Sequence, residues 1–174
     1  RRPVSDSDIS GLMNFYAAGS ERGGFEVGVR RALEAVLASP RFVFRLEWEP
    51  GNKDPGETYR LSDLDLASRL SFFLWGTPPD AELLEIAAEE ELSGKELENQ
   101  AKRMLADRRS EALGTRFAGL WLRLQDLYKI RPDPNFYPNF DENLADAMKR
   151  ETELFFHNLV HEDKSFLELF TADY

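Results

Sequence analysis

Four helix-start signals recur along this sequence, and they constrain its fold more than any other feature. Each has the form Ser/Thr-x-x-Asp/Glu, in which the two side chains satisfy free amide groups in the first turn of a helix. The four pairs are Ser5 with Asp8, Ser62 with Asp65, Thr77 with Asp80, and Ser93 with Glu96. Four such signals in 174 residues predict a chain built mainly from helices.

Apolar residues repeat at helical spacing in three segments, so each segment is predicted to be a helix with one apolar face. The repeats are Phe25, Val29, Ala32, Leu33 and Val36; Leu97, Ala101, Met104 and Leu105; and Leu113, Phe117, Leu120, Trp121 and Leu124. We expect these faces to form the core. Residues 63–75 are apolar around nearly the whole circumference and predict a central, buried helix. A left-handed cap at Gly76 and the prolines after Thr77 predict a tight corner before a helix over 79–91.

Two stretches do not fit a helix throughout. Apolar residues alternate from Arg41 to Glu49, and Ser39-Pro40 resembles a helix start, which together predict a short helical turn followed by an extended segment. The polar loop 50–56 would allow Trp48 to pair with Tyr59 in a minimal hairpin. The second stretch, 131–140, is rich in proline, aromatic residues and asparagine, and Asp141 is predicted to cap the next helix.

These signals predict an all-α fold: a helical bundle of about six to eight helices, with at most one short β-hairpin near residues 46–60. We expect an N-terminal helical subdomain over 1–48, a linker loop over 49–60, and a helical domain over 61–174 that is truncated at its C-terminal end.

Composition excludes several classes of function. The 32 acidic residues exceed the 22 basic ones by 10, which argues against nucleic acid or an anionic membrane surface as partner. The chain has no cysteine, so it holds no disulfide, zinc–thiolate site, iron–sulfur cluster or covalently attached haem. No apolar run approaches the roughly 20 residues of a membrane span, and the first residues are not a signal peptide.

Several segments resemble adjacent domains of unknown function first described in planctomycetes. They are RRPVS at 1–5, ASPRFVFR at 38–45, YRLS at 59–62, ASRLSFFLWG at 67–76 and ETELFF at 151–156. The resemblance spans nearly the whole chain. It implies a periplasmic or extracellular protein in which such domains follow a c-type cytochrome module, with neighbouring domains of the same polypeptide as partners. Any haem would belong to that neighbouring module, because this chain lacks C-x-x-C-H and is expected to hold no cofactor of its own.

The carboxylate of Glu151 is the first candidate for a functional group. A helical wheel over 142–161 places it in the apolar stripe beside Met148 and Phe155, where a carboxylate is either paired or shifted toward neutrality. Pairing with Arg69 across the core is the structural interpretation. The catalytic interpretation joins Glu151 to Glu153 and Asp141 as the acidic half of a site for a polysaccharide or another polymer.

His157 and His161 are spaced i, i+4, a geometry that can hold zinc or copper. The same wheel places both on a charged, solvated face with Asp146, Arg150 and Glu153, so we predict no metal site and no tightly held transition metal.

The 131–140 loop is a third candidate, since its aromatic residues could line a carbohydrate or peptide site or could instead anchor the loop to the core. Taken together, the sequence favours a non-catalytic helical packing or interaction module. The alternatives are an enzyme fragment with an acidic site near Glu151, and a small-ligand or peptide binding module that uses the 131–140 loop.

Overall fold

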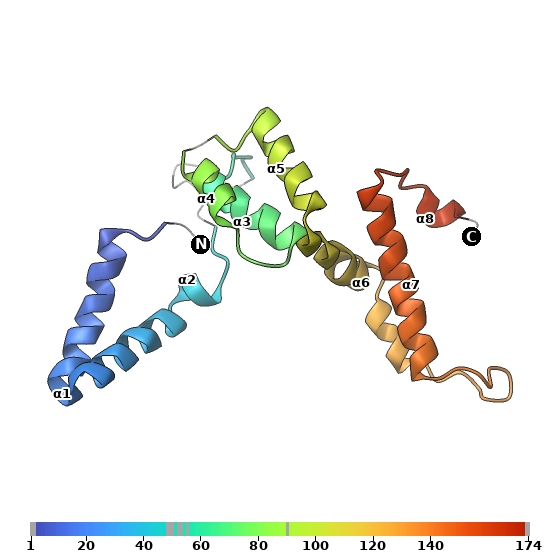
Figure 1. Cartoon of the computed structure of the whole chain (residues 1–174), viewed down its shortest axis with the longest axis horizontal. Coiled ribbons are helices and arrows are strands. Elements are labelled where there is room, and N and C mark those ends of the chain that lie inside the picture. Colours follow the sequence, from blue (N-terminus) through green and yellow to red (C-terminus); the bar gives the residue numbers. More distant parts are fainter. Residues whose placement is uncertain (1–2, 48–50, 52–53, 55, 90, 173–174) are drawn as a thin grey trace. The chain divides into compact units, whose positions relative to one another are not determined.

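The structure, a computed structural model, describes residues 3–47, 51, 54, 56–89 and 91–172. All of the regular secondary structure in these ranges is helical, which confirms the all-α class. The α-helices are α1 (Asp6–Ala38), α2 (Pro40–Val43), α3 (Asp63–Leu74), α4 (Ala81–Ala88), α5 (Gly94–Ala106), α6 (Gly119–Trp121), α7 (Glu142–His161) and α8 (Glu168–Thr171) (Figure 1). Two 3-10 helices, η1 (Arg108–Ser110) and η3 (Leu124–Lys129), and a π-helix, η2 (Leu113–Ala118), complete the order.

The described part of the predicted hairpin region, residues 46–47, 51, 54 and 56–60, contains no strand. Trp48, the proposed partner of Tyr59, lies outside the described residues. The preceding segment follows the prediction: Pro40 opens the short helix α2, and the backbone is extended from Phe44.

The chain divides into two compact units that interleave in sequence. Unit 1 contains the residues up to Arg69 and the stretch Pro78–Ser93, and unit 2 contains Leu70–Thr77 and the residues from Gly94 onward. Helix α3 therefore contributes residues to both units.

In unit 1, helix α1 bends into two arms at Gly23 and Gly24, where the backbone leaves helical geometry (Figure 1). Gly24 has a φ of +77°, a conformation that favours glycine. The arms approach each other closely, because a Cβ atom on Gly28 would lie 2.8 Å from the ring of Tyr16. The N-terminal arm begins with the predicted capping box, in which Ser5 and Asp8 bond reciprocally.

The predicted burial of the 25–36 face is wrong for much of the second arm. Phe25 is 70% exposed and Leu33 is 57% exposed. The reason is geometric: the arms meet at Gly28, which has no side chain to bury, and although the Phe25 ring lies 6.2 Å from the Tyr16 ring of the first arm, most of its surface stays in solvent.

Helix α4 also starts later than the sequence suggested. It begins at Ala81 rather than 79, because the Asp80 carboxylate is itself the cap and accepts a hydrogen bond from the Leu83 amide at 3.1 Å. Leu83 and Leu92 are fully buried in unit 1, and the Leu92 amide donates to the buried Asp63 carboxylate at 2.8 Å.

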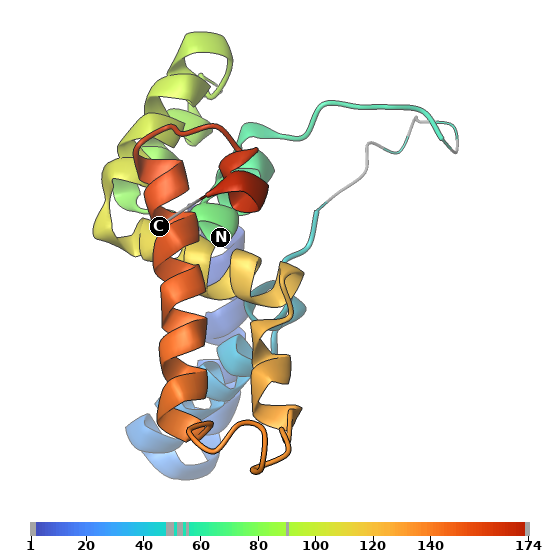
Figure 2. The same cartoon turned by 90° about the vertical axis from the view of Figure 1, so that its right-hand side faces the viewer.

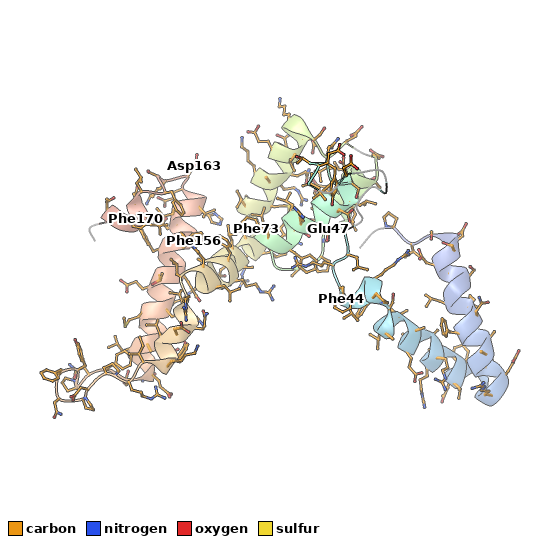
Figure 3. The ribbon with its side chains drawn as sticks, turned by 180° about the vertical axis from the view of Figure 1, so that it is seen from behind. Phe44, Glu47, Phe73, Phe156, Asp163 and Phe170 are labelled. Atoms are coloured by element: carbon orange, nitrogen blue, oxygen red, sulfur yellow. The ribbon has the colours of Figure 1, made fainter. Side chains whose placement is uncertain are left out.

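Helix α3 agrees with the prediction in its bounds but not in its burial. The Ser62 and Asp65 side chains cap it as expected. However, Phe73, near its C-terminal end, is 52% exposed (Figure 3), so α3 is not buried all round. Gly76, with a φ of +68°, ends the helix in the expected left-handed conformation.

Trp75 organises the first part of unit 2. Its indole N–H donates to the Met104 carbonyl at 2.8 Å, and the Arg109 guanidinium lies 3.5 Å from the ring centre. Asp107 holds Arg109 through two side-chain hydrogen bonds, and those bonds lower the pKa of Asp107 to about 2.

The rest of unit 2 is built around α7. The π-helix η2 packs on it at Gly114, where a Cβ atom would lie only 3.1 Å from the carbonyl oxygen of Glu153. On its other flank η3 runs beside α7, and the 131–140 loop joins the two at one end (Figure 2). No helix in the described part of the chain is long and apolar enough to cross a membrane.

Candidate functional site

Glu151 is exposed, so the prediction that it is buried is wrong. The buried face of α7 is formed by Ala145, Glu153, Phe156 and Leu159. Leu144 and Met148, which oriented the helical wheel, are each 40% exposed. The wheel failed because α7 has apolar residues over a wide arc, and the arc that η2 covers is not the one with the most apolar residues.

The predicted ion pair of Glu151 with Arg69 is also wrong. Arg69 instead donates two hydrogen bonds of 2.6 Å to Glu47, which lies in the extended segment after α2 and is labelled in Figure 3. These hydrogen bonds lower the pKa of the Glu47 carboxyl, and the same pairing raises the pKa of Arg69. The bidentate pair joins two segments of unit 1.

Glu153 is the carboxylate that α7 buries, with 7% of its surface exposed. One of its oxygens lies 3.4 Å from the Arg150 guanidinium, and the other lies 3.9 Å from the Lys149 ammonium. Arg150 also bonds Glu111 at 2.7 Å, and this hydrogen bond lowers the pKa of the Glu111 carboxyl. Arg150 thus links the buried carboxylate of α7 to the residue that follows η1.

The three acidic residues of the enzyme hypothesis have separate roles. Asp141 caps α7 as predicted, accepting a hydrogen bond from the Leu144 amide at 2.8 Å. Glu153 belongs to the Arg150 ion pairs, whereas Glu151 has no ion pair with another described residue. The three carboxylates therefore do not form one acidic site.

The histidines lie against η1 and η2, so the prediction that both face solvent is wrong for His157, which is half-buried. Their ring centres are 4.0 Å apart, and His161 Nε2 lies 3.0 Å from the Ser110 hydroxyl. Burial, and then the charge of His161, lowers the pKa of His157. Within the described ranges no three His, Cys, Asp or Glu residues are grouped so that they could hold a metal ion.

Glu151 lines an open groove of about 390 Å³ between η3 and α7. The other lining residues are Leu122, Arg123, Leu124, Asp126, Leu127, Ile130, Met148 and Thr152. Arg123 holds a left-handed backbone conformation, with a φ of 56°, which is costly for a residue with a side chain. In the 131–140 loop, Phe136 and Tyr137 are exposed, so these two rings do not anchor the loop to the core.

The second arm of α1 presents an apolar surface that sequence reasoning assigned to the core. We call Phe25, Val29, Leu33 and Leu37 the α1 ridge; together with Glu26, Arg30 and Glu34 they line an open groove of about 440 Å³. All four ridge residues follow one another at intervals of four. The regular apolar spacing was therefore a correct signal of one helix face, but it did not indicate what covers that face.

Unit 2 presents a second apolar surface, which we call the aromatic face: Phe73, Phe117, Trp121 and Phe166. Successive ring centres lie 5.4, 6.0 and 5.7 Å apart. Each of the four side chains is between 42% and 55% exposed. Phe117 also contacts Phe156 of the unit 2 core, labelled with Phe73 in Figure 3, so the core supports the face from below.

Family comparisons agree with the resemblance of the sequence segments. Residues 61–174 match the PSD4 family, described as proteins of unknown function (DUF1592). This match covers more than half of the chain. The chain belongs to the PSD4 family. Residues 1–47 match a second family of proteins of unknown function, PSD5 (DUF1595). No curated protein and no solved structure matches the PSD4 chain.

Proposed function

We propose that this PSD4 chain is a non-catalytic packing module whose exposed apolar surfaces dock against neighbouring domains of a larger polypeptide. The observation that carries the proposal is that large apolar side chains are grouped together on these two solvent-exposed surfaces. The α1 ridge places large apolar side chains in solvent at intervals of four residues, and the aromatic face exposes four neighbouring rings. Large contiguous apolar patches are rare on proteins that act alone, because solvent exposure of apolar area is unfavourable.

The polar groups support a structural role. Asp141 caps a helix, and Glu153 is paired with Arg150. In the described ranges, no buried side-chain nitrogen or oxygen lacks a hydrogen-bond partner. Catalytic sites commonly contain charged groups held in strained or desolvated settings, and these residues instead have ordinary structural partners.

The wider context of the proposal comes from the resemblance to planctomycete-type domains. On that resemblance we propose that the module belongs to an exported protein, in the periplasm or outside the cell, beside a c-type cytochrome module that would carry the haem. The acidic net charge of −10 fits a protein partner better than a polyanion.

A second candidate function is the binding of a small ligand or peptide in the groove beside Glu151. It is favoured by a carboxylate that has no ion pair with another described residue, at the edge of a partly apolar groove, and by the constrained backbone of Arg123. Thermal-shift screening of peptides and oligosaccharides tests it, with Glu151→Gln as the variant that should lose any response.

Matched substitutions in the isolated chain and in the longer polypeptide test the packing proposal. Leu33→Asp places a charge on the α1 ridge, and Leu154→Asp makes the same change at an exposed position of α7 outside both surfaces. Leu33→Asp should leave the melting temperature of the isolated chain unchanged, but lower that of the longer polypeptide by about 4–8 °C, because a buried contact is lost.

Leu154→Asp should leave both melting temperatures unchanged. The proposal fails if Leu33→Asp has the same effect in both settings, or no effect in either.

A further inference from the structure

The α1 ridge has the geometry of a helix-packing surface. Side chains four residues apart form one of the ridges with which helices interlock, and the space beside such a ridge accepts the ridge of another helix. Phe25, Val29, Leu33 and Leu37 form this row and line the 440 Å³ groove. A peptide that docks as a β-strand needs a sheet edge to pair with, and the residues that the structure describes provide none.

A row of charges runs parallel to the ridge. Glu26, Arg30 and Glu34 follow at the same interval of four and line the same groove. Glu34 forms an ion pair with Arg31 at 3.1 Å, and both side chains are more than half exposed. Glu26 and Arg30 form no ion pair with another described residue, so both are available to a partner.

We propose that the α1 ridge binds one amphipathic helix whose apolar stripe is flanked by a basic–acidic–basic row. This inference rests on the proposed packing function and names the chemistry of one partner. The partner's basic groups would face Glu26 and Glu34, and its acidic group would face Arg30. Opposite charges at a rim set the register and choice of partner more than the affinity, whereas the apolar ridge supplies most of the contact energy.

The charge row disfavours a second copy of the chain that pairs along the full length of the row. When two copies align about Arg30, in parallel or antiparallel, each acidic residue faces an acidic residue and Arg30 faces Arg30. Like charges opposite each other disfavour such a pairing. A partner with the reversed row has no such conflict.

Two synthetic helical peptides test the inference against the whole 174-residue chain. Both carry leucine at every fourth position; one has a flanking Lys–Glu–Lys row and the other a Glu–Lys–Glu row. Fluorescence anisotropy of the labelled peptides should show that the Lys–Glu–Lys peptide binds about ten-fold more tightly at low salt. The preference should shrink at high salt, because salt screens exposed charges.

Variants of the chain distinguish the contribution of the α1 ridge to peptide binding from that of the charge row. Leu33→Ser should abolish binding of both peptides, whereas Leu154→Ser, the same change outside the ridge, should not alter it. The triple variant Glu26→Lys, Arg30→Glu, Glu34→Lys should prefer the Glu–Lys–Glu peptide. Circular dichroism confirms that each variant remains folded.

Three results overturn the inference: equal binding of the two peptides, no binding of either, or equal effects of Leu33→Ser and Leu154→Ser. A concentration-dependent dimer that Leu33→Ser abolishes also overturns it, because the occupant is then a second copy. If the peptides fail while Leu33→Asp still destabilises only the longer polypeptide, this inference falls and the packing function stands.

Discussion

Replacing Leu83 with alanine should destabilise the chain far more than the same replacement at Leu33. Both leucines lie in helices of unit 1, but Leu83 is fully buried and Leu33 is 57% exposed. Leucine and alanine have similar helix propensities, so the intrinsic helix contribution to the two changes is nearly equal. The comparison therefore isolates burial.

The magnitudes follow from the environment of each side chain. Leu83→Ala removes apolar contact and leaves a cavity, which costs about 2–5 kcal/mol of unfolding free energy. Leu33 already has most of its surface in water, so Leu33→Ala should change the unfolding free energy by about 0.5 kcal/mol or less.

Urea unfolding followed by far-ultraviolet circular dichroism measures both changes, with each variant examined at two chain concentrations. Equal losses for Leu83→Ala and Leu33→Ala would refute the reasoning, because the chain itself would then cover the α1 ridge. A concentration-dependent loss for Leu33→Ala would indicate that self-association covers it.

Further predictions concern unit 2. Glu153→Ala should cost about 1–3 kcal/mol in urea unfolding because Glu153 itself is buried and the change removes both its packing and its ion pair with Arg150, whereas Glu151→Ala should stay within about 0.5 kcal/mol; the reverse order would restore the sequence-based assignment. Because folding lowers the pKa of His157 below its ordinary value of 6.5, the unfolded chain binds more protons just below pH 6.5. The contribution of His157 to the free energy of unfolding should therefore be fully present above that pH and should be lost as the pH drops through the lowered pKa. A His157→Gln variant whose stability has the same pH profile as the parent chain would contradict this. Trp75→Phe should lower stability by about 1–3 kcal/mol, because the Met104 carbonyl loses its buried donor; a neutral effect would argue against that hydrogen bond. Elemental analysis after mild chelation should find no tightly held transition metal, and about one zinc or copper per chain would prove that wrong.

The local signals in the sequence were sufficient for the fold class and several helix ends. Ser5, Ser62 and Asp141 cap helices as predicted, and Gly76 adopts the expected left-handed conformation. These features depend on residues within a few positions of one another, so sequence spacing encodes them directly. Asp80 shows the limit of such signals. The sequence pattern made Thr77 the helix cap and Asp80 its partner, but Asp80 is itself the N-cap, three residues after Thr77.

The candidate site could not be predicted because it depends on which face of α7 another element covers. The π-helix η2 approaches α7 at Gly114, a position without a side chain, and this contact buries Glu153 rather than Glu151. The cost of burying Glu153 is offset by Arg150, which lies on the same helix. A helical wheel that counts apolar residues cannot identify a buried carboxylate whose ion-pair partner lies on the same helix.

The α1 ridge shows a different limit. Its spacing correctly identified one apolar helix face, but periodicity does not say whether the cover comes from the chain itself or from another molecule. The same holds for Phe117 and Trp121, which were expected in the core and instead belong to the aromatic face.

Hydroxyl-radical footprinting tests the packing function most directly, by comparing side-chain modification in the isolated chain and in the longer polypeptide. We predict that Phe25, Leu33 and Trp121 react several-fold more slowly in the longer polypeptide, because docked domains exclude solvent from the α1 ridge and the aromatic face. Leu154, exposed but outside both surfaces, should react equally in the two. Equal reactivity of Phe25, Leu33 and Trp121 in both settings would contradict the account.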